Sequence, residues 1–210
     1  MGNFKLVCPC LLGVEGLVAE ELRRMDAENV EPQNGRVFFE GSQELIARAN
    51  LSSRYSERVL ILMGNFRALS FEELFQSVKA LPWEQFIGKQ DRFPVKGRSL
   101  DSKLASVPDC QSIIKKAIVE RLKQHYRIPW FEETGRLYQI QFLSLKDTVS
   151  VMIDTCLLYT SQHPPQRVGN ISLRSNAAYP KGGIILYRVH VINQVGFSAI
   201  THVFKGLVLQ

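Results

Sequence analysis

The sequence predicts an α/β protein built from small modules in which helices pack against sheets. Short runs of apolar, β-branched and aromatic residues alternate along the chain with longer segments whose apolar residues recur every three or four positions. Alternation of this kind is typical of helices packed on sheets. The 210 residues suffice for one domain or two small ones with a sizeable apolar core.

Residues 1–68 contain three predicted strands and two predicted helices in the order βαβαβ. The strands are expected at 4–12, 35–41 and 57–68, and the helices at 17–25 and 43–53. Gly13 and Gly16 lead into the first helix, and Ser42 is a suitable N-cap for the second.

Residues 70–154 are predicted to follow the order αβαββ. Ser70 caps a helix over 71–86 that Pro82 kinks or ends. Residues 91–104 begin as a strand and run out into a polar loop, and Asp109 or Ser112 caps a helix over 110–126. The last two strands, 136–145 and 148–154, meet in a hairpin at Lys146-Asp147. Strands this few and short favour ferredoxin-like sandwiches over a large nucleotide-binding sheet.

The formal net charge of +6 belongs mostly to the end of the chain. All 20 acidic residues precede Thr155, whereas five of the 26 lysines and arginines follow it. Residues 1–154 therefore carry a net charge of only +1. The basic composition does not by itself indicate that this part binds nucleic acid, so any such site must be a local patch.

Residues that would carry catalysis or hold a metal are not found in the first three quarters of the sequence. His125 is the only histidine before residue 163, and Cys8 and Cys10 lack the two-residue spacer of zinc hooks and redox pairs. We therefore predict no catalytic residue, no cofactor site and no metal site in this chain. Buried strand cysteines, the absence of a signal peptide and the absence of an apolar stretch long enough to span a bilayer predict a cytoplasmic protein with reduced thiols.

Four segments together resemble one bacterial family. They are "CPCLLGVEGLVAEELRRM", "NGRVFFEG", "RVLILMGNFRALSFEELFQSVKALPWEQFI" and "FPVKGRSLDSKLASVPDCQSIIKKAIVERL". The family is that of the THUMP-domain RNA methyltransferases of the 23S ribosomal-RNA guanine-N2 type, which are also catalogued as N6-adenine-specific DNA methylases. The resemblance implies an N-terminal ferredoxin-like domain, a THUMP domain and then a catalytic domain that binds S-adenosylmethionine.

The resemblance covers residues 5–154 and implies domains at 1–58 (ferredoxin-like) and 59–155 (THUMP). Beyond Thr155 the sequence has neither a glycine-rich cofactor loop nor an Asn/Asp-Pro-Pro-aromatic motif. We interpret 156–210 as a non-family tail, irregular or produced by a sequencing or assembly artefact, because the resemblance, the acidic residues and the amphipathic pattern all stop there. The alternative is a genuine divergent extension.

The resemblance implies that this chain is the RNA-binding front portion of an rRNA methyltransferase without its catalytic domain, and therefore inactive alone. The expected partner is RNA, specifically ribosomal RNA, with S-adenosylmethionine required only by the complete enzyme. The alternative is a stand-alone RNA-binding adaptor that works without catalysis. A DNA methylase is a weaker third reading, because the THUMP domain is associated with RNA.

The best candidates for RNA contact lie in and after the "FPVKGRSLDSKL" segment. Basic side chains there would meet phosphates, hydroxyls would donate hydrogen bonds, and the first turns of the next helix would favour anions. The candidate residues are Lys96, Arg98, Ser99, Ser102, Lys103, Lys115 and Lys116. For each of them an ordinary solvated surface role is the competing interpretation. The aromatic residues Trp83, Phe86, Trp130 and Phe131 are expected to pack in a core or domain interface rather than stack on bases.

Overall fold

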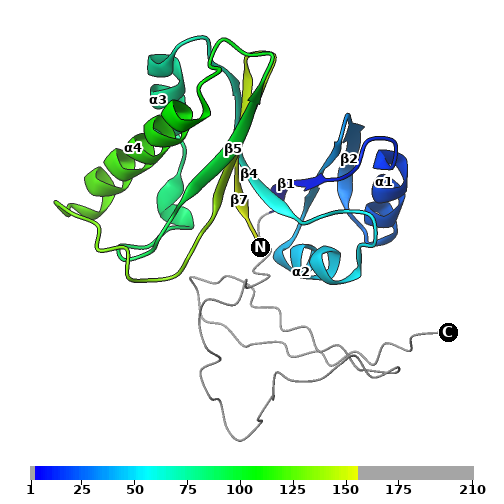
Figure 1. Ribbon diagram of the computed structural model, residues 1–210. Coiled ribbons are helices and arrows are strands. Elements are labelled where there is room, and N and C mark those ends of the chain that lie inside the picture. The colour runs from blue at the N-terminus through cyan, green and yellow to red at the C-terminus, as the bar shows by residue number, and fades with distance from the viewer. Residues whose placement is uncertain (1–2, 156–210) are drawn as a thin grey trace, which may run out of the picture. The chain divides into compact units, whose positions relative to one another are not determined.

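The computed structural model describes residues 3–155 (Figure 1). The predicted tail, 156–210, lies outside the described residues. The elements are β1 (Phe4–Pro9), α1 (Glu15–Arg24), β2 (Glu28–Gln33), β3 (Arg36–Gly41), α2 (Gln43–Ser52), β4 (Leu60–Arg67), α3 (Phe71–Lys79), the 3-10 helix η1 (Trp83–Gln85), β5 (Val95–Leu100), α4 (Val107–Tyr126), β6 (Ile140–Leu145) and β7 (Thr148–Asp154).

The strands form one seven-stranded mixed sheet in the order β2-β3-β1-β4-β7-β6-β5. Only β5 and β6 run parallel; the other neighbouring strands are antiparallel. Helices α3 and α4 lie side by side against the part of the sheet made by β4–β7 (Figure 1). The predicted mixed α/β class is confirmed.

The sequence interpretation missed β2. Its sequence, ENVEPQ, is polar and contains Pro32, which cannot donate a ladder hydrogen bond. The strand lies at the edge of the sheet and pairs only with β3, so a proline and exposed charges are tolerated there. Its formation depends on the pairing partner rather than on its own propensity.

Local signals fixed several element boundaries. The hydroxyls of Ser42 and Ser70 accept hydrogen bonds from the backbone N–H groups of Leu45 and Glu73, as expected of N-caps. The hairpin between β6 and β7 turns at Lys146-Asp147, whose φ angles of 49° and 62° suit a type I′ turn. Helix α4 instead begins at Val107 after Ser106, so the caps predicted at Asp109 or Ser112 were wrong.

The three described cysteines, Cys8, Cys10 and Cys110, are free and buried. This agrees with the prediction that the strand cysteines are structural. Burial raises the pKa of the Cys8 thiol to about 12, since a thiolate would be stripped of water inside the sheet. Among residues 3–155, no helix has the length and hydrophobicity needed to cross a bilayer.

Cys8 is therefore expected to resist alkylation at pH 8 for as long as the protein stays folded. The unfolded thiol, with a reference pKa of 9.0, should react readily. Because the folded pKa is the higher one, the stability contributed by the neutral thiol is present below pH 9 and is lost as the pH rises toward 12. Peptide mapping after pulse alkylation measures this, with a sample in urea as the control. Equal labelling rates in both samples would contradict the prediction.

Candidate nucleic-acid interface

The part of the sheet covered by α3 and α4 has an opposite face that these helices leave uncovered. Side chains alternate along strands, so the register identifies which residues share that face. The residues of this open face include Lys96, Arg98 and Leu100 of β5, Gln141, Leu143 and Leu145 of β6, Thr148, Ser150 and Met152 of β7, and Asn65 and Arg67 of β4. Below we call it the open face.

Lys96 and Arg98 are exposed neighbours on the open face. The sequence interpretation placed them in a loop after a strand; the structure places both inside β5, two positions apart. No carboxylate among the described residues forms an ion pair with either side chain. Two cations fixed on one strand and separated by a single residue offer a row of contacts that suits a chain of phosphates.

Gly97, between these two cations, permits a close approach of β5 to β6. A Cβ atom built at Gly97 would lie 2.3 Å from both the carbonyl oxygen and Cδ1 of Phe142. Phe142 is 2% exposed and belongs to the core below α4. The glycine therefore allows the strand that carries Lys96 and Arg98 to sit tightly on its neighbour.

Ser99 and Ser102 are used within the protein. The Ser99 hydroxyl donates to the carbonyl oxygen of Leu104 at 2.6 Å. The Ser102 hydroxyl donates to the carbonyl oxygen of Leu100 at 3.2 Å and accepts from the Asp147 N–H at 3.0 Å. These contacts hold the turn after β5, so the two serines position the site and are not free donors for RNA.

Lys103 follows the same turn and is exposed. Its backbone N–H donates to the Asp147 carboxylate at 2.8 Å, which ties the turn after β5 to the β6–β7 hairpin. The side chain of Lys103 is thereby carried near the end of the sheet where β5, β6 and β7 finish.

Lys115 and Lys116 do not join the cations of β5. Helix α4 begins three residues earlier than predicted, so both lysines lie about two turns in, away from the positive helix end. The Lys115 ammonium lies 3.8 Å from the centroid of the Phe93 ring and 2.5 Å from the Glu133 carboxylate. Lys116 lies over Phe75 of α3 at 5.6 Å. The predicted convergence of these lysines on a helix N-terminus is wrong.

Two arginines that the sequence interpretation overlooked lie on the same face of the sheet as Lys96. Arg67 is exposed at the end of β4, where it pairs with Thr148. Arg36 of β3 lies over the Phe38 ring at 5.6 Å, and burial lowers its guanidinium pKa. An open hollow of about 320 Å³ is lined by Gln33, Asn34, Arg36 and Leu145. Arg67 and Arg36 can be placed on this face only from the strand register, which depends on pairing between segments that are distant in sequence.

The aromatic residues divide into two groups. Trp83 is fully buried and its indole N–H donates to the Val78 carbonyl oxygen at 2.8 Å, and buried Phe131 packs edge-on against Phe93. Phe86 is half-buried beside Phe4. The expectation of packing is confirmed for these three. Trp130 is 75% exposed, so the same expectation is wrong for it: within residues 3–155 its indole is not packed in a core.

Within residues 3–155 no cluster of His, Cys, Asp or Glu has the arrangement of a metal site. The described part of the chain contains exposed basic side chains on β5 and internal hydrogen bonds that hold the turn after this strand.

Comparison with protein families assigns both parts of this architecture. Residues 5–60 match the family model described as the RlmL ferredoxin-like domain, and residues 68–154 match the THUMP domain. The chain therefore contains an RlmL-type ferredoxin-like domain followed by a THUMP domain. Lys96, Arg98 and Lys103 all lie inside the THUMP match, as does Arg67's partner Thr148. The finer boundaries expected at 1–58 and 59–155 stay predictions.

Several named proteins are similar to this chain over much of its length. YpsC of Bacillus subtilis strain 168, named as an RNA methyltransferase, is 42% identical over 157 residues, which are 74% of this chain and 40% of YpsC. The ribosomal RNA large subunit methyltransferase K/L of Psychromonas ingrahamii is 30% identical over 118 residues, 56% of this chain and 16% of that enzyme. The crystal structure of SMU.472, described as a methyltransferase in complex with S-adenosylhomocysteine, matches with a TM-score of 0.70 and 41% identity over 74% of this chain and 42% of that protein.

The family resemblance inferred from the sequence is confirmed by these matches. The chain spans less than half the length of each relative, and the matched THUMP-containing region ends at Asp154.

Proposed function

We propose that this chain is the RNA-binding front portion of an S-adenosylmethionine-dependent rRNA guanine-N2 methyltransferase. The observation that carries the proposal is the exposed pair Lys96 and Arg98 on the open face of the THUMP domain, without carboxylate partners among the described residues. The names of YpsC and of the ribosomal RNA methyltransferase K/L support RNA, and specifically ribosomal RNA, as the partner. Ribosomal RNA as the substrate implies a cytoplasmic location.

S-adenosylmethionine would serve the complete enzyme and not this part of it. Its support is the S-adenosylhomocysteine bound to SMU.472, since that molecule is what remains after the methyl group is transferred. We assign no residue of 3–155 to the cofactor.

Lys96, Arg98 and Lys103 would contact phosphates, and Arg67 would extend the row across β4. Each phosphate that a lysine or arginine neutralises releases counterions, so affinity must fall as salt rises. Arg36, which faces the hollow beside Leu145, adds a fifth cation from the ferredoxin-like domain. Because the net charge of residues 1–154 is small, this local set of side chains supplies the attraction.

The test is the triple variant Lys96→Ala, Arg98→Ala, Lys103→Ala. RNA affinity should fall on the order of 10- to 100-fold, and the slope of log affinity against log salt should become shallower by about three, one for each lost phosphate contact. Fluorescence anisotropy with an rRNA fragment, measured across a salt series, gives both quantities.

The matched control removes three exposed cations elsewhere, Arg24, Arg54 and Lys89. It lowers the net charge equally and should change affinity and slope much less. Circular dichroism must show both variants folded. Equal losses in the two variants, or none in either, would remove the open face from the proposed function.

A further inference from the structure

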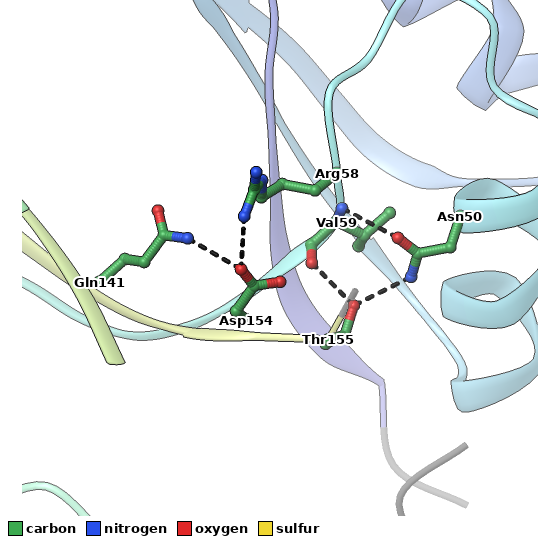
Figure 2. A network of polar contacts seen from close by, with 6 residues as sticks. All are labelled: Asn50, Arg58, Val59, Gln141, Asp154 and Thr155. Atoms are coloured by element: carbon green, nitrogen blue, oxygen red, sulfur yellow. Dashed lines mark hydrogen bonds and ion pairs between the residues drawn. The ribbon is translucent and has the colours of Figure 1, made fainter. Parts of the chain in front are cut away.

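A network of polar contacts surrounds the end of β7 (Figure 2). The Asp154 carboxylate is 6% exposed, and its Oδ2 accepts hydrogen bonds from the Arg58 guanidinium at 2.7 Å and from the Gln141 amide at 2.9 Å. Arg58 belongs to the connection between α2 and β4, and Gln141 belongs to β6. The buried carboxylate thus joins the beginning of β4 to the centre of the THUMP sheet.

Asn50 of α2 forms the second half of the network (Figure 2). Its side-chain oxygen accepts from the Val59 N–H at 3.2 Å, and its amide nitrogen donates to the Thr155 hydroxyl at 3.0 Å. The Thr155 hydroxyl in turn donates to the Val59 carbonyl oxygen at 2.7 Å. One side chain of the ferredoxin-like domain therefore holds both the first residue before β4 and the last described residue of the THUMP domain.

Few other contacts along the sheet connect the two domains. Strands β1 and β4 share only the pairs Leu6–Ile61 and Val7–Leu60, whereas β4 and β7 are paired along their whole length. A small apolar cluster of Val7, Leu60 and Met152 lies beside these pairs. Phe38, Leu62 and Leu143 pack against this cluster. The two strand pairs and these apolar contacts make a small junction, in which directional hydrogen bonds help to fix the orientation of the two domains.

We propose that Asn50, Arg58 and Asp154 form an interdomain clasp that makes the ferredoxin-like and THUMP domains unfold as one cooperative unit. The chemistry explains why the contacts hold. A buried carboxylate that loses its cation is strongly unfavourable, so Asp154 keeps Arg58, and with it the start of β4, in place. Both the oxygen and the nitrogen of the Asn50 amide form bridging hydrogen bonds, so moving α2 away would break these two contacts together. No buried side-chain nitrogen or oxygen of the described residues lacks a hydrogen-bond partner.

The test compares native-state hydrogen exchange in the full chain with that in the double variant Asn50→Ala, Thr155→Val. Both changes leave the Asp154 pair intact and remove the two hydrogen bonds that join Asn50 to Val59 and Thr155, together with the bond from the Asn50 amide to the Ile46 carbonyl and that from the Thr155 hydroxyl to the Val59 carbonyl. In the parent protein, the slowest amides of β3 and of β7 should open with the same free energy. In the variant, the β3 amides should exchange at least tenfold faster while the β7 amides stay close to the parental rate. Residue-resolved mass spectrometry or NMR measures both.

A purely stabilising role would accelerate exchange equally in β3 and β7, and that result would overturn the proposal, as would no change in either strand. The matched control is Asn65→Ala, which removes a hydrogen bond to Ser150 inside the THUMP sheet and should not separate the two strands. If the double variant fails to fold, Thr155→Val alone provides the same comparison, with a smaller separation.

The clasp does not rest on RNA binding. The triple variant of Lys96, Arg98 and Lys103 should leave the shared opening of β3 and β7 intact, so the two proposals fail separately.

Discussion

Trp83→Ala is expected to lower the free energy of unfolding by about 4 kcal/mol, the range measured for large aromatic residues truncated in a core. Trp83 is fully buried, and its indole N–H donates to the Val78 carbonyl oxygen at the end of α3. The change would empty the space between α3, η1 and α4 and remove one of the donors to that carbonyl, which would keep the Leu81 N–H. Urea unfolding followed by circular dichroism measures the loss.

Trp130→Ala is the matched control, because that indole is 75% exposed. It should change stability by less than about 0.5 kcal/mol, as surface substitutions usually do. Similar losses in the two variants would show that the packing around Trp83 differs from the structure described above.

Gly97→Ala is expected to destabilise the THUMP domain by about 3 kcal/mol, at the upper end of the cost of overpacking. The added methyl group would lie 2.3 Å from the backbone oxygen of Phe142, and backbone cannot yield as the end of a flexible side chain can. Relief requires β5 to move away from β6, which would displace Lys96 and Arg98 as well. Thermal unfolding should show the loss, and RNA anisotropy should show weaker binding even below the melting temperature.

Gly16→Ala is the control for replacing a glycine by alanine. Gly16 lies in α1 with nothing within 4 Å of an added Cβ, so alanine should stabilise the helix by up to about 1 kcal/mol. A Gly97→Ala protein as stable as its parent would mean that β5 and β6 are not packed as closely as described.

The elements predicted well from sequence were those whose signals are local. Ser42, Ser70 and the Lys146-Asp147 turn act on neighbouring residues, and all three do what their chemistry predicts. Strand β2 could not be predicted in this way, since ENVEPQ is polar and forms a strand only because β3 lies beside it. The mixed sheet order likewise depends on pairings between distant segments.

Only part of the candidate site could be predicted from the sequence, because only some of its residues are close together in the chain. Lys96 and Arg98 are neighbours in sequence and lie two positions apart on β5, and Lys103 follows in the turn after this strand. Lys115 was grouped with them because the start of α4 was misplaced, yet its ammonium is engaged by Phe93 and Glu133. Arg67 and Arg36 come from other strands, and only the register brings them to the same face.

Strand β5 is the last strand of the sheet, so one side of its backbone has no strand partner among the described residues. An unpaired edge can template the addition of a strand from another molecule, and charged side chains oppose this. The charges on Lys96 and Arg98 that would attract RNA would therefore also oppose pairing of this edge with a second copy of the protein. Bound RNA would neutralise these charges, but it would also cover the same region and would then itself block the addition of a strand at this edge. Removing both charges should leave a protein that self-associates through this edge at high concentration.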